Sequence, residues 1–166
     1  MTLHAAFRAG FIRRWHSNPD LAHIADRIDG HSGRVARIIA MLHPAPSVEL
    51  LRAALSHDDG EELTGDVSAE FKRQRSDIAT ALHYAEKDHR LLVWGDDPHL
   101  SDEDKRWLRF ADRLDAYMWA AHHAPHVMLG DGWPEYGVRL RRAADDLGVD
   151  LQEHLGPLAW RIFEDD

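Results

Sequence analysis

Apolar residues recur at helical spacing in nearly every segment of the chain, and no stretch alternates apolar and polar residues as a half-buried strand would. One segment places Val35, Ile38, Ile39 and Leu42 three or four positions apart, which puts them on one face of a helix. The pattern predicts an all-α fold. We expect a helical bundle in which each helix buries one apolar face.

Breaks in the pattern predict the ends of the helices. A first helix is expected to end near residues 17–20, and a second to start around residues 30–32. The expected inward residues of the first helix are Leu3, Phe7, Phe11 and Ile12. Ser47 is expected to cap a third helix. The expected inward residues of that helix are Val48, Leu51, Ala54 and Leu55.

The second half of the chain follows the same pattern. Helices are expected from near Ser68 and then through residues 78–92. Ser101 followed by Asp104 resembles a capping box and predicts the start of a long helix that contains Asp112 and Asp115. Two more helices are expected near residues 135–147 and 150–164, with a kink at residues 156–157.

Composition narrows the chemistry open to the chain. At 166 residues it has the length of one domain, residues 1–166, and without cysteine it excludes disulfides and thiolate chemistry. Any metal ion must be held by carboxylates or by some of the 13 histidines. The formal charge of -9 and the lack of a run of about 18 apolar residues predict a cytoplasmic protein that binds no nucleic acid and no membrane.

A group of polar residues ends the third expected helix, in the stretch ALSHDDGEELTGD. At a frayed helix end the adjacent His57 and Asp58 can converge on one cation, whereas neighbours inside a helix diverge by about 100°. Asp112 lies in a mostly apolar helix, where a carboxylate needs a partner. His31 opens the second expected helix and could supply a further nitrogen. These four residues are candidate ligands of a divalent ion.

Each candidate also has an ordinary structural interpretation. A histidine at a helix start, such as His31, is more often a capping or surface residue. The His57 and Asp58 pair is as often a polar helix end as a metal pair, and a neighbouring arginine could neutralise Asp112. Taken one at a time, the residues leave both interpretations open.

The order of these residues resembles that of the HD-domain phosphohydrolase superfamily. HDDGEELTGDVSAEFK is similar to the loop of bacterial 5'-deoxynucleotidases and related phage nucleotide phosphohydrolases. GHSGRVA and ADRLDAY resemble the segments around the family's first and last metal ligands, and RRW at 13–15 resembles its Arg-Trp pair. The resemblance covers about residues 10–120 and implies an HD-domain helical bundle, which in this family often dimerises, so a homo-oligomer is expected.

The resemblance implies a role for each matched residue. The expected metal ligands are His31, His57, Asp58 and Asp112. The expected catalytic residues are Glu61 and Asp66. The expected substrate-binding residues are Arg14, Trp15 and Lys72. Glu61 would orient or deprotonate a water or protonate the leaving oxygen, and Asp66 would contact the sugar 3'-hydroxyl or relay a proton. Asp59 and Glu62 are expected to be solvated.

The implied activity is metal-dependent hydrolysis of the 5'-phosphate ester of a deoxynucleotide, with Zn, Co, Mn or Mg as the cofactor. The basic run at residues 72–75 favours a deoxynucleoside triphosphate over a monophosphate, although a solvated basic helix face explains the run equally well. The phage enzymes that the chain resembles include ones that act on dATP. A 5'-deoxynucleotidase, a non-enzymatic nucleotide or metal sensor and a helical interaction module remain as alternatives.

The chain departs from the family in two places. The acid expected before the first metal histidine is Gly30, and the segment between Trp15 and His31 differs in length and content. Because that segment would lie near the base, base preference does not follow from the resemblance.

Overall fold

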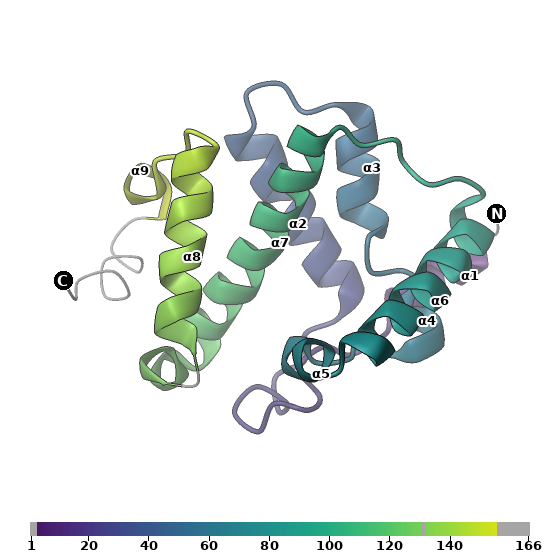
Figure 1. The fold of residues 1–166 in the computed structure, drawn as a ribbon, viewed down its shortest axis with the longest axis horizontal. Helices are drawn as coiled ribbons and strands as arrows, with labels where there is room; N and C mark the ends of the chain where they lie inside the picture. The colour runs from purple at the N-terminus through teal and green to yellow at the C-terminus, as the bar shows by residue number, and fades with distance from the viewer. Residues whose placement is uncertain (1–2, 131, 156–166) are drawn as a thin grey trace.

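The protein is an all-α bundle, as the apolar pattern predicts. The structure is a computed structural model that describes residues 3–130 and 132–155, and these residues form helices and no strand. The helices, in chain order, are α1 Leu3–Ala9, α2 Ile28–Leu42, α3 Val48–Ser56, α4 Glu61–Thr64, α5 Ala69–Gln74, α6 Ser76–Trp94, α7 Asp102–His123, the 3-10 helix η1 Pro125–Leu129, α8 Trp133–Asp146 and α9 Leu151–Leu155 (Figure 1).

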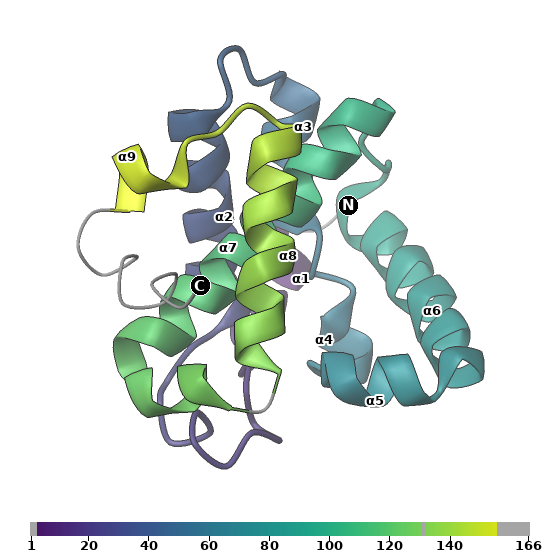
Figure 2. The same cartoon turned by 60° about the vertical axis from the view of Figure 1, so that its left-hand side comes forward.

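Helices α2, α3 and α8 pack around α7 (Figure 1 and Figure 2). These four helices are called the bundle below. Val35 and Ile39 of α2, Leu50 of α3, and Phe110 and Leu114 of α7 are each at most 1% exposed. Burial of one such side chain contributes roughly 1.5–3 kcal/mol. This shared core fixes α2, α3 and α7 relative to one another.

Serine caps confirm two predicted helix starts. Ser47 Oγ accepts the Leu50 N–H at 3.0 Å at the start of α3. Ser101 and Asp104 form the predicted capping box at the start of α7. Capping satisfies N–H groups that have no partner within the helix, so α3 and α7 begin at defined residues.

The inward face predicted for α3 is right for Ala54 and Leu51, which packs against the core, and wrong for Val48 and Leu55. Val48 and Leu55 are 71% and 48% exposed, whereas Leu50 and Ala53 are buried beside the correctly predicted Ala54. Apolar side chains project from most sides of this short helix. Their spacing therefore predicts a helix but does not show which of its sides is buried. Contacts with α2 and α7 select the buried side.

The first helix is also shorter and more exposed than predicted. It ends at Ala9, and Leu3 and Phe7 are 86% and 66% exposed. The chain then runs beside the start of α2: the Arg14 N–H donates to the Asp26 carbonyl, and the Ile28 N–H donates to the Ile12 carbonyl, both at 3.1 Å. These bonds replace helical ones and place residues 13–15 next to α2.

The last expected helix is described in part. Helix α8 agrees with the prediction near residues 135–147, and α9 covers Leu151–Leu155. The remainder of that expected helix, with the kink at residues 156–157, lies outside the described residues.

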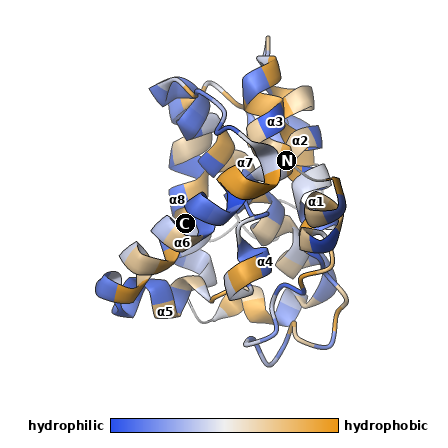
Figure 3. Cartoon of the chain, turned by 90° about the vertical axis from the view of Figure 1, so that its right-hand side faces the viewer, coloured by the Kyte–Doolittle hydropathy of each residue, from blue (hydrophilic) through white to orange (hydrophobic). Residues whose placement is uncertain are grey.

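Helices α4, α5 and α6, called the arm below, differ from the bundle in burial. Helix α5, which the structure describes in full, buries none of its residues, and in α6 the buried residue is Val93. Hydrophobic and hydrophilic residues lie side by side on α4 (Figure 3), where Leu63 is 63% exposed. The arm contributes little apolar surface to the core.

Candidate metal centre

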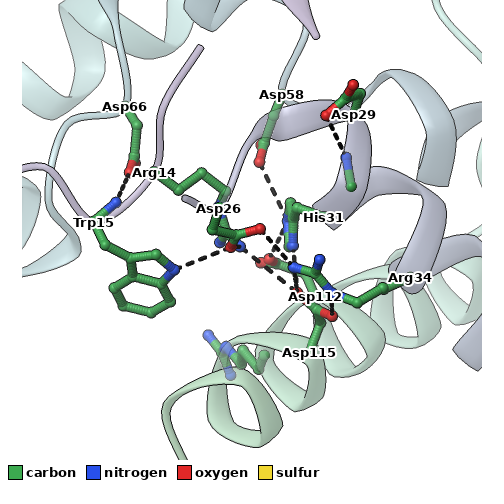
Figure 4. A network of polar contacts seen from close by, with 12 residues as sticks. Arg14, Trp15, Asp26, Asp29, His31, Arg34, Asp58, Asp66, Asp112 and Asp115 are labelled. Carbon is green, nitrogen blue, oxygen red and sulfur yellow. Dashed lines mark hydrogen bonds and ion pairs between the residues drawn. The ribbon is translucent and has the colours of Figure 1, made fainter. Parts of the chain in front are cut away.

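Four predicted metal ligands meet where three helices of the bundle approach one another. His31 lies near the start of α2, His57 caps the C-terminus of α3 with Asp58 directly after it, and Asp112 lies midway along α7. Figure 4 shows His31, Asp58 and Asp112 pointing toward one another. The packing of α2 against α3 and α7 brings these residues together from distant parts of the sequence.

The ligand atoms converge closely. His31 Nε2 lies 3.2 Å from His57 Nε2, 3.3 Å from Asp58 Oδ2 and 3.2 Å from Asp112 Oδ1. His57 Nε2 lies 3.4 Å from Asp58 Oδ2 and 4.0 Å from Asp112 Oδ1. Ligands bound at about 2.0–2.2 Å to one ion lie about 3–4 Å apart, so these separations suit a shared cation.

The outer ring nitrogens of both histidines are already engaged. His57 Nδ1 lies 2.9 Å from the Ala54 carbonyl oxygen, which can only accept a hydrogen bond. His31 Nδ1 lies 2.7 Å from Asp115 Oδ2. Each Nδ1 therefore carries the proton, and in the neutral rings both Nε2 atoms present lone pairs to each other and to two carboxylates. Acceptors that face one another in this way need a positive charge between them, either a proton on His31 Nε2 or a metal ion.

The electrostatics of His31 agree with a cation site. Burial disfavours charge on this ring, but hydrogen bonds to Asp112, Asp115 and Asp58 outweigh burial and raise the pKa of His31 to about 10. The charges of His57 and His31 likewise hold the pKa of Asp58 well below its usual range, although burial acts in the other direction. A proton on His31 is the positive charge that a metal ion would replace.

The group of three residues whose ligand atoms all lie within 4.8 Å of one another is His31, His57 and Asp112. Asp58 stands outside that group, but its Oδ2 lies within 3.4 Å of both Nε2 atoms. We count Asp58 as a fourth ligand because its short contacts are to the two nitrogens that a cation must satisfy. The His31 side chain is 0% exposed and that of Asp112 is 40% exposed, so solvent reaches the group from the Asp112 side.

Glu61 lies beside this group on the arm. It is 7% exposed, its Oε2 is buried without a hydrogen-bond partner, and its Oε1 lies 3.8 Å from Lys72 Nζ. Burial and the charges of Asp58 and Asp66 raise the pKa of Glu61 to about 9. At neutral pH this carboxyl group is protonated and can donate a proton.

Two glutamates flank the side chain of Lys72. Lys72 Nζ lies 3.3 Å from Glu86 Oε1, which also accepts a hydrogen bond from Thr64 Oγ1 at 3.3 Å. Position 60 must be glycine, because a Cβ there would lie 2.2 Å from the Glu86 carbonyl oxygen. This close approach holds the loop after His57 against α6.

Arg14, Trp15 and Asp66 meet on another side of the group (Figure 4). Asp66 Oδ2 accepts the Trp15 backbone N–H at 3.0 Å. Trp15 has a φ of +64°, a left-handed conformation that L residues other than asparagine and aspartate rarely adopt. Arg14 NH1 lies 3.2 Å from Asp26 Oδ2 and so points inward. All three residues therefore lie beside the candidate metal centre.

Three residues of the centre were not singled out from the sequence as site residues. Asp115 accepts the His31 Nδ1–H, Arg34 pairs with Asp115 at 2.6 Å, and Asp26 is 1% exposed beneath both arginines. The sequence could have indicated two of them. Arg34 follows His31 by one helical turn and Asp115 follows Asp112 by one turn, so each lies on the same helix face as a candidate ligand. A Cβ at Gly30 would lie 3.9 Å from Asp26 Oδ1, so a carboxylate lies beside this glycine.

The predicted solvation of Asp59 and Glu62 is wrong. Asp59 is 5% exposed and its Oδ2 accepts the Trp94 Nε1–H at 2.7 Å. Glu62 pairs with His89 at 2.8 Å and with Arg8 at 2.9 Å. The loop folds back onto α6 and α1, which gives these acids partners that local sequence does not reveal.

The arginines of the basic run form ion pairs at the protein surface. Arg73 pairs with Glu70, and Arg75 pairs with Asp77 at 2.7 Å, both on the exposed surface. Asp112 pairs within the described residues with His31 and His57 and not with a neighbouring arginine. Lys72 is the cation of the run that lies beside Glu61. Because the two arginines are paired elsewhere, the run as a whole gives no support to a triphosphate substrate.

No protein-family model and no curated protein matches the chain. Within the described residues, no helix is long and apolar enough to cross a membrane.

Proposed function

We propose that this protein is a metal-dependent phosphohydrolase that cleaves the phosphate ester at the 5' carbon of a deoxynucleotide. One observation carries the proposal: the Nε2 atoms of His31 and His57 lie 3.2 Å apart, and each lies 3.2–4.0 Å from carboxylate oxygens of Asp58 and Asp112, where a metal ion can replace the proton on His31. Two nitrogen and two oxygen ligands suit Zn, Co, Mn or Fe, and Mg with additional water. When bound, such an ion supplies an activated water and polarises the phosphoryl group.

The chain's own residues supply the remaining chemistry. Glu61, protonated by its buried surroundings, would donate its proton to the leaving 5' oxygen of the sugar. Lys72, on helix α5 of the arm, would contact the phosphate through a charge-assisted hydrogen bond. The exposed side of Asp112 is the side from which a phosphate ester would approach. Trp15 and Asp66 would contact the sugar or the base.

The monophosphate and triphosphate reactions share one scissile bond. Attack at the phosphorus next to the sugar releases phosphate from a monophosphate and triphosphate from a triphosphate, with the same nucleoside. A preference for triphosphate stays a prediction from the sequence, as do base preference and homo-oligomer formation.

The test is a product assay. The protein is incubated with each deoxynucleoside mono- and triphosphate in the presence of Zn, Co, Mn or Mg, and the products are resolved by chromatography. The proposal expects free deoxynucleoside, and it expects Asp58→Ala to abolish its release. Orthophosphate without nucleoside from the triphosphates would contradict the triphosphate reaction, and nucleotide binding without turnover would favour the sensor alternative.

A further inference from the structure

A buried polar network runs beneath the metal centre and ends at Trp15. Asp26 is its middle member, at 1% exposure. Its Oδ2 accepts the Trp15 Nε1–H at 3.1 Å and lies 3.2 Å from Arg14 NH1. Its Oδ1 accepts a hydrogen bond from Arg34 NH2 at 2.9 Å. Both carboxylate oxygens are therefore used, and each faces a different part of the site (Figure 4).

Arg34 joins this carboxylate to the one that orients a metal ligand. Its Nε and NH2 donate to Asp115 at 2.6 Å and 3.1 Å, while NH2 also reaches Asp26. Its guanidinium carbon lies 4.1 Å from the centroid of the Trp119 ring, and this cation–π contact helps to fix the orientation of the guanidinium group. Asp115 in turn accepts the His31 Nδ1–H at 2.7 Å. A continuous set of contacts thus connects His31 to the indole of Trp15.

Trp15 needs such support because its backbone is left-handed, with a φ of +64°. A bulky L residue stays in that region only where its surroundings hold it, and residues of this kind cluster at functional sites. Here the backbone N–H is held by Asp66 at 3.0 Å and the indole by Asp26 at 3.1 Å. The two anchors come from different parts of the chain, the loop after α4 and the turn before α2.

We propose that Asp26 and Arg34 are positioning residues that lock Trp15 to His31, so that the substrate-contacting segment and the metal centre keep one fixed relative geometry. The proposal rests on the proposed function in one respect, namely that Trp15 contacts the substrate. Neither Asp26 nor Arg34 is itself a metal ligand, so their effects must pass through their neighbours Asp115, Trp15 and Arg14.

The first experiment reads the network without any substrate. In a spectrum of ¹⁵N-labelled protein the Trp15 indole N–H peak is assigned by its loss in Trp15→Phe. The peak should move in Asp26→Asn, which keeps the size of the side chain, and also in Arg34→Met, although Arg34 does not touch Trp15. Arg52→Met is the matched control, because Arg52 makes a similar two-pronged pair with Asp96 on the exposed surface. That control should leave the peak in place.

The second experiment separates the two ends of the network. Arg34→Met should weaken binding of the metal alone by about tenfold, the cost of losing an outer partner of a ligand, and raise KM by a similar factor. Asp26→Asn should raise KM while metal affinity changes less than about threefold. Should Arg34→Met fail to fold, Arg34→Lys tests the same point, because lysine keeps the charge without the fork.

An unmoved Trp15 peak in folded Asp26 and Arg34 variants would overturn the proposal, and so would equal shifts in the Arg52 control. Failure of the proposed function gives a different result. The wild-type protein would then release no nucleoside, while the peak positions and the metal affinities would still report on the network.

Discussion

The bundle and the arm contribute different parts of the site. The bundle supplies His31, His57, Asp58 and Asp112 from helices that share a buried core. The arm supplies Glu61 and Lys72 from helices that bury little apolar surface, with none buried in α5 and Val93 buried in α6. Four acceptors that would repel one another need rigid support. Glu61 and Lys72, two of the residues that would meet a substrate, thus lie on helices with few buried apolar contacts, and such helices are expected to open at lower cost.

The first prediction separates chemistry from ion binding. Glu61→Gln should keep the ion and lose about 10²- to 10⁴-fold in kcat, because an amide cannot donate the proton of the carboxyl group. Turnover and metal content are measured on the same sample. Glu62→Gln is the matched control, since Glu62 pairs with His89 and Arg8 instead of facing the centre. Loss of the ion in Glu61→Gln would contradict the claim that the bundle alone binds the ion and the arm supplies the proton donor.

The second prediction concerns local opening. Amides of α5 and α6 should exchange with solvent hydrogen about a hundredfold faster than those in the middle of α2 and α7, because few buried apolar contacts oppose their opening. Hydrogen exchange followed by mass spectrometry measures the difference. A nucleotide that contacts Lys72 should slow exchange in the arm. Equal protection of arm and bundle in the free protein would contradict the comparison.

The third prediction follows from the raised pKa of His31, to about 10. Below that pH, ion binding must displace a proton from the ring, so affinity for the metal should rise about tenfold per pH unit between 6 and 8. Competition with a chelator at fixed pH values measures the affinity. A flat profile would show that His31 is neutral before the ion binds.

The fourth prediction uses the neighbour of a metal ligand. Burial raises the pKa of Asp59 to about 6, above the ordinary 3.8 of the unfolded chain, so its ionisation opposes folding. That cost is fully present above about pH 6 and absent below about pH 4. Asp59→Asn, which still accepts the Trp94 N–H, should therefore stabilise the protein by about 1–2 kcal/mol at pH 7.5 and by nothing at pH 3.5. Thermal unfolding at the two pH values measures this difference.

Sequence predicted the parts of the molecule that local rules govern. The helical period of the apolar residues gave the all-α class, and the serines at 47 and 101 gave two helix starts, because capping depends on residues close in sequence. The resemblance predicted which four residues would come together. The spacing of these residues along the chain could not by itself show that they meet, because their contacts depend on how α2, α3 and α7 pack.

Sequence could not predict contacts that arise when distant segments meet. Asp59 and Glu62 looked like solvated loop acids, and their partners Trp94 and His89 come from the far end of α6. The buried role of Asp26 depends on a backbone pairing between residues 12–14 and 26–28 that no apolar pattern marks. In α3 the buried side depended on the placement of its neighbours. Each of these is a tertiary effect that local spacing does not encode.

The measurement that tests the account most directly is the number and affinity of divalent ions bound per chain. The account predicts one ion per chain for the wild-type protein by elemental analysis and calorimetry with Mn, Co or Zn. It predicts loss of that ion in His57→Ala, with retention in His89→Ala, a half-buried histidine of the arm bonded to Glu62. A folded His57→Ala protein that binds the ion as tightly as the wild type would contradict it.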